Sequence, residues 1–196
     1  MSMWVSFSLL LVLAYLLGSI CSAIPICKLF GLPDPRSTGS SNPGATNVMR
    51  IGGKLPAALT FLADAFKAAP PILAAMWLQL HPAMISVVAF AAILGHVYPL
   101  YFRFAGGKGV ATAFGILLVL DWRLFVAAGI SWLAVFAVTR ISSVASLVAM
   151  VLAAPLASYY YAPQLFLGIS LIGLLVLWRH KQNIRDLVIG AERGFR

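Results

Sequence analysis

Charged residues are scarce in this sequence, and acidic residues are the scarcest. Among 196 residues there are 5 Asp and Glu against 14 Lys and Arg, and charged residues make up 10% of the chain. Hydrophobic residues make up 62%, and the mean hydropathy is +0.97. So few charged groups cannot cover the surface of a sizeable soluble domain. The composition therefore predicts an integral membrane protein with little mass outside the bilayer.

Cysteine is almost absent as well, which argues against two kinds of site. The two cysteines, Cys21 and Cys27, lie near the end of one apolar run with no histidine or further cysteine beside them. We therefore expect neither a disulfide framework nor a metal site. No repeat and no linker divides the chain, so residues 1–196 are expected to form one domain. The first run lacks the basic start and cleavage site of a signal peptide and is expected to be a retained anchor.

Long apolar runs dominate the rest of the sequence. Runs of roughly 15 to 25 residues are long enough for transmembrane helices. About seven such runs are present: 4–27, 55–80, 82–102, 109–120, 124–139, 143–161 and 164–178. The sequence therefore predicts an all-α, polytopic transmembrane helical bundle of about seven spans. The fourth and seventh runs are short, which leaves five or six spans as an alternative.

The net charge of +9 could suit nucleic acid, but the cations follow a membrane topology. With seven spans, the even-numbered connections contain only Arg123, and Lys67 falls inside a span. The other cations lie in the odd-numbered connections and the tail: Lys28, Arg36, Arg50, Lys54, Arg103, Lys108, Arg140, Arg179, Lys181, Arg185, Arg193 and Arg196. Because cytoplasmic loops are enriched in Lys and Arg, we expect an external N-terminus, a cytoplasmic C-terminus and no nucleic-acid partner.

Polar residues are concentrated in four segments, 28–54, 103–109, 140–146 and 179–196. The predicted topology places all four on one face of the membrane. A pore needs polar groups through the depth of the bilayer or on both faces. A one-sided cluster therefore favours a reaction centre at the cytoplasmic interface.

The first polar segment contains a stretch, residues 36–50, that is suited to holding a phosphate. It is rich in hydroxyl, amide and glycine residues and is framed by Arg36 and Arg50. Backbone N–H groups and arginines bind phosphate readily, whereas they pack poorly against apolar side chains. The alternative is a solvated connector between two spans.

The second segment places glycines on both sides of Lys108, in Ala105-Gly-Gly-Lys-Gly-Val-Ala-Thr112. It lacks the spacing of a P-loop, which disfavours an NTPase. The glycines still allow backbone N–H groups to approach an anion, and Val110 is expected to begin a helix whose N-terminus favours negative ligands. The alternative is an interfacial turn in which the lysine reaches the lipid headgroups.

Three polar residues lie inside predicted spans. Asp64 and Lys67, at i and i+3, are expected to neutralise each other on one helix face. Lys67 could in addition reach a ligand. His96 is expected to make a structural hydrogen bond, for example to a backbone carbonyl, in preference to a catalytic role.

The third and fourth segments add hydroxyl, imidazole and amide groups. Ser142 is expected to cap the sixth span, and Ser143 and Ser146 lie one turn apart on a common face that could offer hydroxyls to a phosphate. The tail contributes His180, Asn183 and Glu192. A basic tail that is merely attracted to anionic lipid does not require such varied chemistry.

Taken in this order, the motifs resemble the bacterial acyl-phosphate:glycerol-3-phosphate acyltransferases, the PlsY family of membrane enzymes. The resemblance spans nearly the whole chain. It is carried by Gly18-Ser19, Arg36 with Gly39-Ser40-x-Asn42-x-Gly44-Ala45-Thr46-Asn47, Gly95-His96-x-x-Pro99, Gly106-Gly-Lys-Gly-Val-Ala-Thr112, Arg140-x-x-Ser143-x-x-Ser146, and Arg179-His-x-x-Asn183-Ile184 with Glu192.

The resemblance implies transfer of a fatty acyl group from an acyl phosphate to the 1-hydroxyl of sn-glycerol 3-phosphate. The products would be 1-acyl-sn-glycerol 3-phosphate (lysophosphatidic acid) and phosphate, in the first acylation step of phospholipid synthesis. It also implies no metal or cofactor, contact with membrane lipid, and a functional link to a soluble acyl-phosphate synthase. The location implied is the bacterial cytoplasmic (inner) membrane, with the active site on the cytoplasmic side.

From the motifs and the resemblance together we expect a site with two phosphate sockets at the edge of the hydrocarbon, and the acyl chain among the apolar spans. The catalytic residues are expected to be His180, Asn183, Lys108 and Ser143. The substrate-binding residues are expected to be Arg36, Ser40, Asn42, Gly44, Thr46, Asn47, Arg50, Lys67, His96, Gly106, Gly107, Gly109, Ser146 and Glu192.

The implied reaction is attack by an alcohol on a carbonyl with a good leaving group, so positioning and charge stabilisation can supply much of the rate. His96, His180 and Glu192 are candidate bases. A substrate phosphate with a second pKa of about 6 can itself accept the proton, and we favour this substrate-assisted route.

Two alternatives remain open at the level of sequence. Within the enzyme class, the rival is a covalent acyl-serine, which no Gly-x-Ser-x-Gly elbow supports. From a different class, the alternative is a small membrane transporter of an organic phosphate, for which the cations and the intramembrane Asp64 and Lys67 would be the support.

Overall fold

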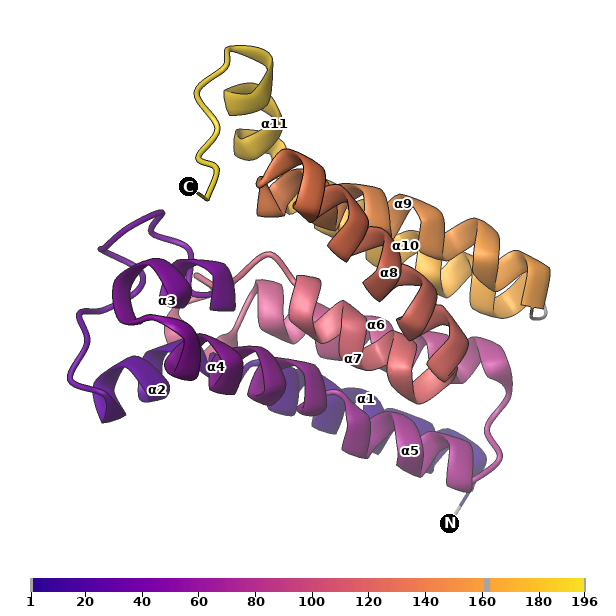
Figure 1. Ribbon diagram of the computed structural model, residues 1–196. Coiled ribbons are helices and arrows are strands. Elements are labelled where there is room, and N and C mark those ends of the chain that lie inside the picture. The colour runs from indigo at the N-terminus through magenta and orange to yellow at the C-terminus, as the bar shows by residue number, and fades with distance from the viewer. Residues whose placement is uncertain (1, 161–162, 196) are drawn as a thin grey trace.

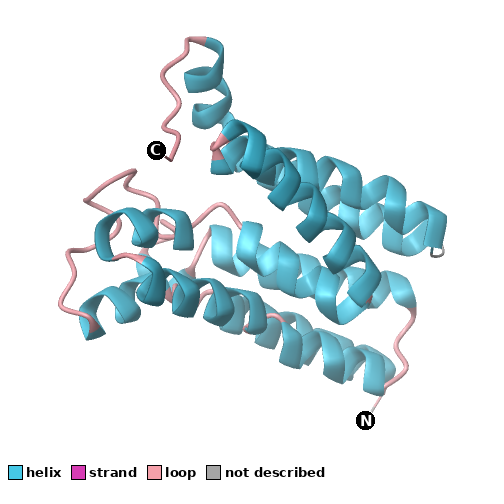
Figure 2. Ribbon diagram, viewed as in Figure 1, coloured by secondary structure: helices cyan, strands magenta, loops and turns pink. Residues whose placement is uncertain are grey.

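The computed structural model describes residues 2–160 and 163–195, and every regular element among them is helical (Figures 1 and 2). The first half of the chain forms α1 (Met3–Gly18), α2 (Ala23–Leu29), α3 (Ala45–Gly52), α4 (Lys54–Phe66), α5 (Ala69–Trp77) and α6 (Pro82–Val97). A short 3-10 turn, η1 (Leu100–Phe102), precedes α7 (Val110–Leu120), α8 (Trp122–Thr139), α9 (Ser142–Tyr160), α10 (Pro163–Arg179) and α11 (Lys181–Val188). The predicted all-α class is confirmed over the described residues.

Four helical stretches are long and apolar enough to cross a membrane: Met3–Leu29, Lys54–Trp77, Pro82–Phe102 and Trp122–Thr139. Three shorter apolar helices cover Val110–Leu120, Ser142–Ala157 and Leu165–Arg179. Together they coincide with the seven runs recognised in the sequence, while the number that cross the bilayer stays a prediction. Residue 161, the predicted end of the sixth run, lies outside the described residues.

The first two predicted spans are each divided into two helices, which the apolar pattern did not indicate. α1 ends at Gly18, where an added Cβ would stand 2.1 Å from the carbonyl oxygen of Ala92, so the backbones of α1 and α6 are in close contact there. The second division falls between α4 and α5, just before Pro70 and Pro71. Proline has no backbone N–H donor and disfavours the helical conformation of the residue before it, which accounts for that break.

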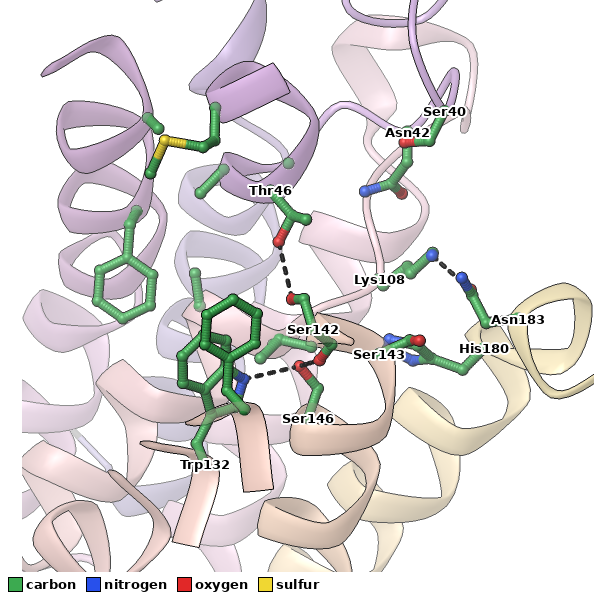
Figure 3. A pocket seen from close by; sticks show the side chains of 18 of the residues that line it. Ser40, Asn42, Thr46, Lys108, Trp132, Ser142, Ser143, Ser146, His180 and Asn183 are labelled. Atoms are coloured by element: carbon green, nitrogen blue, oxygen red, sulfur yellow. Dashed lines mark hydrogen bonds between the residues drawn. The ribbon is translucent and has the colours of Figure 1, made fainter. Parts of the chain in front are cut away.

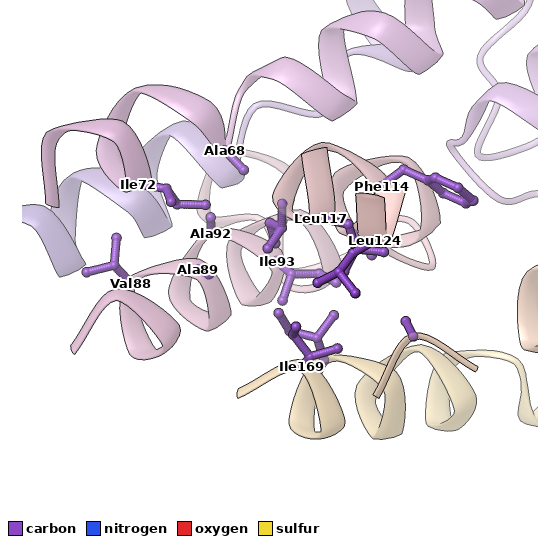
Figure 4. Packing of buried hydrophobic residues seen from close by; sticks show 14 of the residues in the cluster. Ala68, Ile72, Val88, Ala89, Ala92, Ile93, Phe114, Leu117, Leu124 and Ile169 are labelled. Atoms are coloured by element: carbon purple, nitrogen blue, oxygen red, sulfur yellow. The ribbon is translucent and has the colours of Figure 1, made fainter. Parts of the chain in front are cut away.

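The core is built from small and branched side chains on helices that pack closely (Figure 4). Ala68 and Ile72 of the second helical stretch lie against α6, whose Val88, Ala89 and Ala92 are fully buried. In a lipid environment helices associate mainly by close packing, which small residues at the crossings permit. The helix bundle formed in this way holds the polar segments at one end.

The polar segments gather at one end of the bundle. Figure 1 shows α2, α3, α11 and the C-terminus together at this end, with the N-terminus and the α5–α6 connection at the opposite end. α8 finishes and α9 starts at the same polar end, so all four segments recognised in the sequence share it. The predicted grouping is present in the fold, and the membrane face on which it lies stays a prediction.

Candidate active site

A cavity of about 1210 Å³ lies at the polar end of the bundle. Each of the four polar segments contributes to its wall, including Gly39 to Thr46, Lys108, Arg140 with the serines of α9, and the tail from Arg179 to Phe195. Figure 3 shows side chains from α3, α9, α11 and the loop before α7 facing the same space. Segments separated by more than a hundred residues are therefore brought to one site.

Three helix N-termini border this cavity. α3 begins after Gly44, α7 begins after Gly109, and α9 begins at Ser142, and all of these residues line the cavity. Neither Gly44 nor Gly109 caps its helix with a side chain, and Gly109 has a φ of 87°, in the left-handed region that favours glycine. Helix N-termini offer backbone N–H groups and a positive dipole end, so the cavity is suited to anions. The expectation that Val110 begins a helix is confirmed.

The cavity wall carries more cations than carboxylates. Asp64, Asp186 and Glu192 are the acidic residues of the lining, and Asp64 is neutralised elsewhere by Lys67. The cations of the lining are Arg50, Lys54, Lys108, Arg140, Arg179 and Arg193. Burial lowers the pKa of the Arg50 guanidinium from its ordinary value, and that of the Lys108 ammonium to about 8. A bound phosphate would relieve this cost by supplying the opposite charge.

One hydrogen-bond network joins three of the four predicted catalytic residues. The Lys108 Nζ donates to Oδ1 of Asn183, whose Nδ2 donates to Oε1 of Glu192 at 2.7 Å. The Ser143 hydroxyl donates to the same Oε1 at 2.6 Å. Glu192 therefore fixes the orientation of Ser143 and Asn183 directly, and that of Lys108 through Asn183.

The fourth predicted catalytic residue, His180, is buried at the junction of α10 and α11 and also lines the cavity. Its Nδ1 lies 2.8 Å from the carbonyl oxygen of Val176, which can only accept, so Nδ1 carries the proton. Burial, with a further contribution from Lys108, lowers the pKa of this imidazole to about 4. At neutral pH the ring is uncharged, and its Nε2 is a hydrogen-bond acceptor and a weak base.

The loop before α7 is held between His96 and Arg179. The Arg179 guanidinium donates to the carbonyl oxygens of Gly106 at 3.1 Å and Gly107 at 3.2 Å, and the Gly107 N–H donates to the His96 carbonyl. An added Cβ at Gly107 would stand 2.3 Å from Nε2 of His96. The two glycines are thus used for close packing that positions Lys108. Neither lines the cavity.

The intramembrane Asp64 and Lys67 form the ion pair that their spacing predicted, at 2.8 Å. Lys67 Nζ also donates to the carbonyl oxygen of Ile20 and lies 2.7 Å from Nδ1 of His96. His96 is therefore held by a lysine, where a backbone carbonyl was the expected partner. The three side chains are almost fully buried, and their contacts tie the turn after α1 and the end of α4 to α6 at the cavity wall.

In the first polar segment the structure separates supporting residues from cavity residues. The Asn47 side chain is fully buried, accepts from the Ser40 N–H and donates to the carbonyl oxygens of Pro35 and Thr38. Asn47 therefore shapes the loop from within. The Arg36 guanidinium pairs with Asp34 at 2.6 Å and lies outside the cavity lining.

The structure brings most of the predicted site residues to the cavity. Those that line it are Ser40, Asn42, Gly44, Thr46, Arg50, His96, Lys108, Gly109, Ser143, Ser146, His180, Asn183 and Glu192. Those that do not line it are Arg36, Asn47, Lys67, Gly106 and Gly107. In the structure the residues of this second group contact other parts of the protein from outside the cavity wall. Their expected contacts with substrate stay predictions.

Two features of the α9 start differ from expectation. Ser142 is the first residue of α9, and its hydroxyl forms a 3.1 Å hydrogen bond with Oγ1 of Thr46, where a capping role was expected. The Ser146 hydroxyl donates to the Ser142 carbonyl and accepts from Nε1 of Trp132. These bonds link α3, α8 and α9 across the cavity.

An apolar furrow continues the cavity into the bundle, and no residue of it had been singled out from the sequence. One wall is α8, whose Phe125, Gly129, Trp132, Leu133 and Phe136 recur at helical spacing. The opposite wall is α4, with Ala57, Ala58, Phe61 and Leu62, and the floor is the start of α7. The α8 residues share one helix face because they are spaced three or four apart, a signal that was present in the sequence.

The tail crosses the mouth of the cavity. The Arg193 guanidinium donates to the Gly39 carbonyl at 2.9 Å, and the Arg50 guanidinium donates to the Arg193 carbonyl at 3.1 Å. Phe195 packs edge-on against Phe136 with ring centroids 5.7 Å apart. This strap connects the first polar segment to the end of α8 and places Glu192 inside the cavity.

This chain is similar both in sequence and in fold to known proteins of one family. The family profile of glycerol-3-phosphate acyltransferases matches residues 8–190. The glycerol-3-phosphate acyltransferase of Idiomarina loihiensis is 48% identical over 188 residues, covering 96% of this chain and 95% of the relative.

Two crystal structures of PlsY (YgiH), an integral membrane glycerol 3-phosphate acyltransferase, have the same fold. The glycerol 3-phosphate form is 36% identical with a TM-score of 0.92, and the lysophosphatidic acid form is 35% identical with a TM-score of 0.90. Each comparison covers 97% of this chain and 96% of the solved one. This chain therefore belongs to the glycerol-3-phosphate acyltransferase family, and it is an integral membrane acyltransferase of the PlsY type.

Proposed function

We propose that the protein transfers a fatty acyl group from an acyl phosphate to the 1-hydroxyl of sn-glycerol 3-phosphate. The observation that carries the proposal is the continuity of the cavity, in which a cationic chamber bordered by helix N-termini leads directly into an apolar furrow. An acyl phosphate has the same two parts, a phosphate and a fatty chain. Glycerol 3-phosphate adds a second phosphate, for which the chamber supplies further cations.

The binding roles follow from the position of each group. Lys108 and the α7 N-terminus on one side, and Arg50 with the α3 N-terminus on the other, provide two regions for phosphate. The acyl chain occupies the furrow between α4 and α8. Ser143, Asn183 and His180 lie between these regions, where the carbonyl and the attacking hydroxyl would meet.

The proposed chemistry is a direct transfer. The C1 hydroxyl oxygen of glycerol 3-phosphate bonds to the acyl carbonyl carbon, the bond from that carbon to the phosphate oxygen breaks, and inorganic phosphate leaves. The hydroxyl proton passes to a phosphate oxygen of a substrate. Positioning and stabilisation of the developing charge by Lys108 and the Ser143 hydroxyl supply the rate.

The candidate bases of the protein are poorly suited to take this proton. His180 has a pKa of about 4, and Oε1 of Glu192 already accepts hydrogen bonds from Ser143 and Asn183. His96 Nδ1 is occupied by Lys67. A phosphate with a second pKa of about 6 is a stronger acceptor than His180 at neutral pH, which supports substrate assistance.

The test of the activity is turnover in detergent. The purified protein should release phosphate from palmitoyl phosphate only when glycerol 3-phosphate is present, with one lysophosphatidic acid formed per phosphate. Phosphate release that does not depend on glycerol 3-phosphate, or uptake of an organic phosphate by vesicles without turnover, would contradict the proposal and favour hydrolysis or transport.

A second measurement tests the proton acceptor. The rate should fall as the pH drops through about 6, because the phosphate loses its basic form, and His180→Gln should keep this limb of the profile. If His180→Ala and His96→Ala each abolished turnover with binding and fold retained, and a protein pKa emerged in the profile, substrate assistance would be wrong. Labelled acyl phosphate without acceptor should leave no label on serine.

A further inference from the structure

Gly129 is an unusual glycine within its helix. α8 runs without interruption from Trp122 to Thr139, and Gly129 lies near its middle, where glycine weakens a helix. Close packing against a neighbouring helix is one reason for a glycine at such a position. The other helical glycines show how glycine permits close packing in this fold.

At most of those glycines a neighbouring backbone or side chain occupies the space that a Cβ would take. An added Cβ would stand 2.1 Å from the Ala92 carbonyl oxygen at Gly18, 2.3 Å from the Tyr15 carbonyl oxygen at Gly95, and 1.9 Å from the Ala65 carbonyl oxygen at Gly115. At Gly129, by contrast, no described heavy atom lies within 4 Å of the added Cβ apart from the two neighbouring residues and the backbone of α8 itself. Close packing therefore does not explain Gly129.

The open space at Gly129 belongs to the apolar furrow. Phe125 is one turn away along α8 in one direction and Trp132 and Leu133 lie one turn away in the other, and all of them line the cavity. Gly129 is thus the gap in an otherwise bulky helix face. A chain lying in the furrow would pass over this gap.

Three phenylalanines, one from each bordering helix, meet beyond this gap. Phe61 of α4 lies 6.3 Å from Phe114 of α7 between ring centroids, and Phe114 lies 6.0 Å from Phe125 of α8 with the rings nearly perpendicular. Aromatic rings in contact in this way pack tightly. The three rings thus meet across α4, α7 and α8 at the level of Phe125, where we place the closed end of the furrow.

The length of the furrow suits a long acyl chain. From Phe136, at the polar end, to Phe125 there are eleven residues of α8, or roughly 16 Å at 1.5 Å per residue. This equals about half of the 30 Å hydrocarbon thickness of a bilayer, the length that one leaflet's acyl chain spans. A side chain at position 129 would end the furrow one helical turn, or about 6 Å, earlier.

We propose that Gly129 determines the length of acyl chain that the enzyme accepts, because its missing side chain leaves the last turn of the furrow open to the end of the donor's fatty chain. The inference rests on the proposed acyl-phosphate activity. It adds a specificity-determining residue in the furrow, outside the groups proposed to carry out the transfer.

The test compares donors of two lengths, palmitoyl phosphate and octanoyl phosphate, with Gly129→Leu and Gly129→Ala. With palmitoyl phosphate, the kcat/KM of the leucine variant should fall by about 10–200-fold, which is the usual discrimination against a substrate with more carbon atoms than a pocket can hold. With octanoyl phosphate, its kcat/KM should change by less than about twofold. Gly129→Ala should fall between leucine and wild type. The matched control is Ala134→Leu, an exposed position of α8 outside the cavity lining.

The outcomes separate the two proposals. Wild-type protein that turns over neither donor contradicts the acyl-phosphate activity itself. If the wild type is active, an unchanged ratio between donors in Gly129→Leu shows that the chain leaves the furrow before α8 residue 129, and it overturns the inference. An equal loss with both donors also overturns it. Should the leucine variant fail to fold, as judged by gel filtration in detergent, Gly129→Ala decides by the same ratio.

Discussion

At the scale of single residues, Glu192 acts as the organiser of the proposed catalytic side chains. One of its oxygens, Oε1, accepts from both Ser143 and Asn183, and Asn183 in turn accepts from Lys108. The glutamine side chain has an equivalent oxygen that can accept the same two bonds, whereas alanine has none. Glu192 therefore offers a way to separate hydrogen bonding from charge.

We expect Glu192→Gln to retain most of the wild-type kcat and Glu192→Ala to have a kcat about 10–100-fold lower. This loss corresponds to the cost of about 1–3 kcal/mol for leaving a buried polar group without its hydrogen-bond partner. The measurement is steady-state turnover in detergent with both variants at equal purity. Complete loss in the glutamine variant would instead identify Glu192 as the base, since charge and not geometry would then be essential.

Lys108 carries the clearest prediction about pH. Its folded-state pKa of about 8 means that the ammonium is present below pH 8 and is lost as the pH rises above it. Because kcat/KM reports the ionisation of the free enzyme, we expect kcat/KM to fall above about pH 8 as phosphate binding weakens.

The matched variant is Lys108→Arg, whose guanidinium stays charged throughout the accessible range. At pH 7 the kcat/KM of this variant should be lower than that of the wild type, because a planar guanidinium differs in shape from an ammonium group. Its kcat/KM should nevertheless show no decline near pH 8. A decline at the same pH in the arginine variant would assign that limb of the profile to another group.

At the scale of elements, the loop before α7 depends on contacts between distant helices. Gly107 packs against the His96 ring of α6, and Arg179 of α10 holds the carbonyls of Gly106 and Gly107. The sequence indicated glycines that let an anion approach. The structure shows glycines that let His96 approach, which positions Lys108 from behind.

Gly107→Ala is therefore expected to destabilise the protein by about 1–3 kcal/mol, the usual cost of forcing extra volume into a packed site, and to reduce turnover. The control is Gly173→Ala, where the added Cβ would lie at an ordinary 3.5 Å from the Met150 carbonyl oxygen. Thermal unfolding in detergent measures both. Equal melting temperatures for the two variants would show that the loop moves aside without cost.

At the scale of the whole molecule, the arrangement of charge predicts the orientation in the membrane. The polar end contains most of the cations, and the opposite end contains the N-terminus and the α7–α8 connection. By the positive-inside rule we predict that the cavity faces the cytoplasm. The same rule predicts that opposite ends of α8 lie on opposite sides of the bilayer.

Cysteine labelling in intact cells tests this orientation. A membrane-impermeant maleimide should label Trp122→Cys, which is exposed beside the α7–α8 connection, and should not label Arg185→Cys in α11 until the cells are opened. The native Cys21 and Cys27 are buried and provide little background. Labelling of both positions from outside would refute the predicted number of spans, and the reverse pattern would refute the orientation.

Some of the site could be predicted from sequence because the relevant contacts are local. The Asp64–Lys67 pair follows from i,i+3 spacing on one helix, and the start of α7 at Val110 follows from the glycine before it. The partner of His96 could not be predicted, since Lys67 lies 29 residues away, at the end of α4. The supporting role of Asn47 was likewise missed, because a polar residue in a loop looks the same whether it faces a ligand or its own backbone.

The sequence by itself determined the helical class, the apolar runs and the concentration of polar residues in four segments, because hydropathy, helical period and charge are properties of short stretches of chain. The tertiary structure decided which of those polar residues face a common cavity, and that an apolar furrow extends from it. Lys108 and Asn183 meet across 75 residues, and Ser143 and Glu192 across 49. Such contacts depend on how whole helices pack, and packing is settled by the fit of many small surfaces at once.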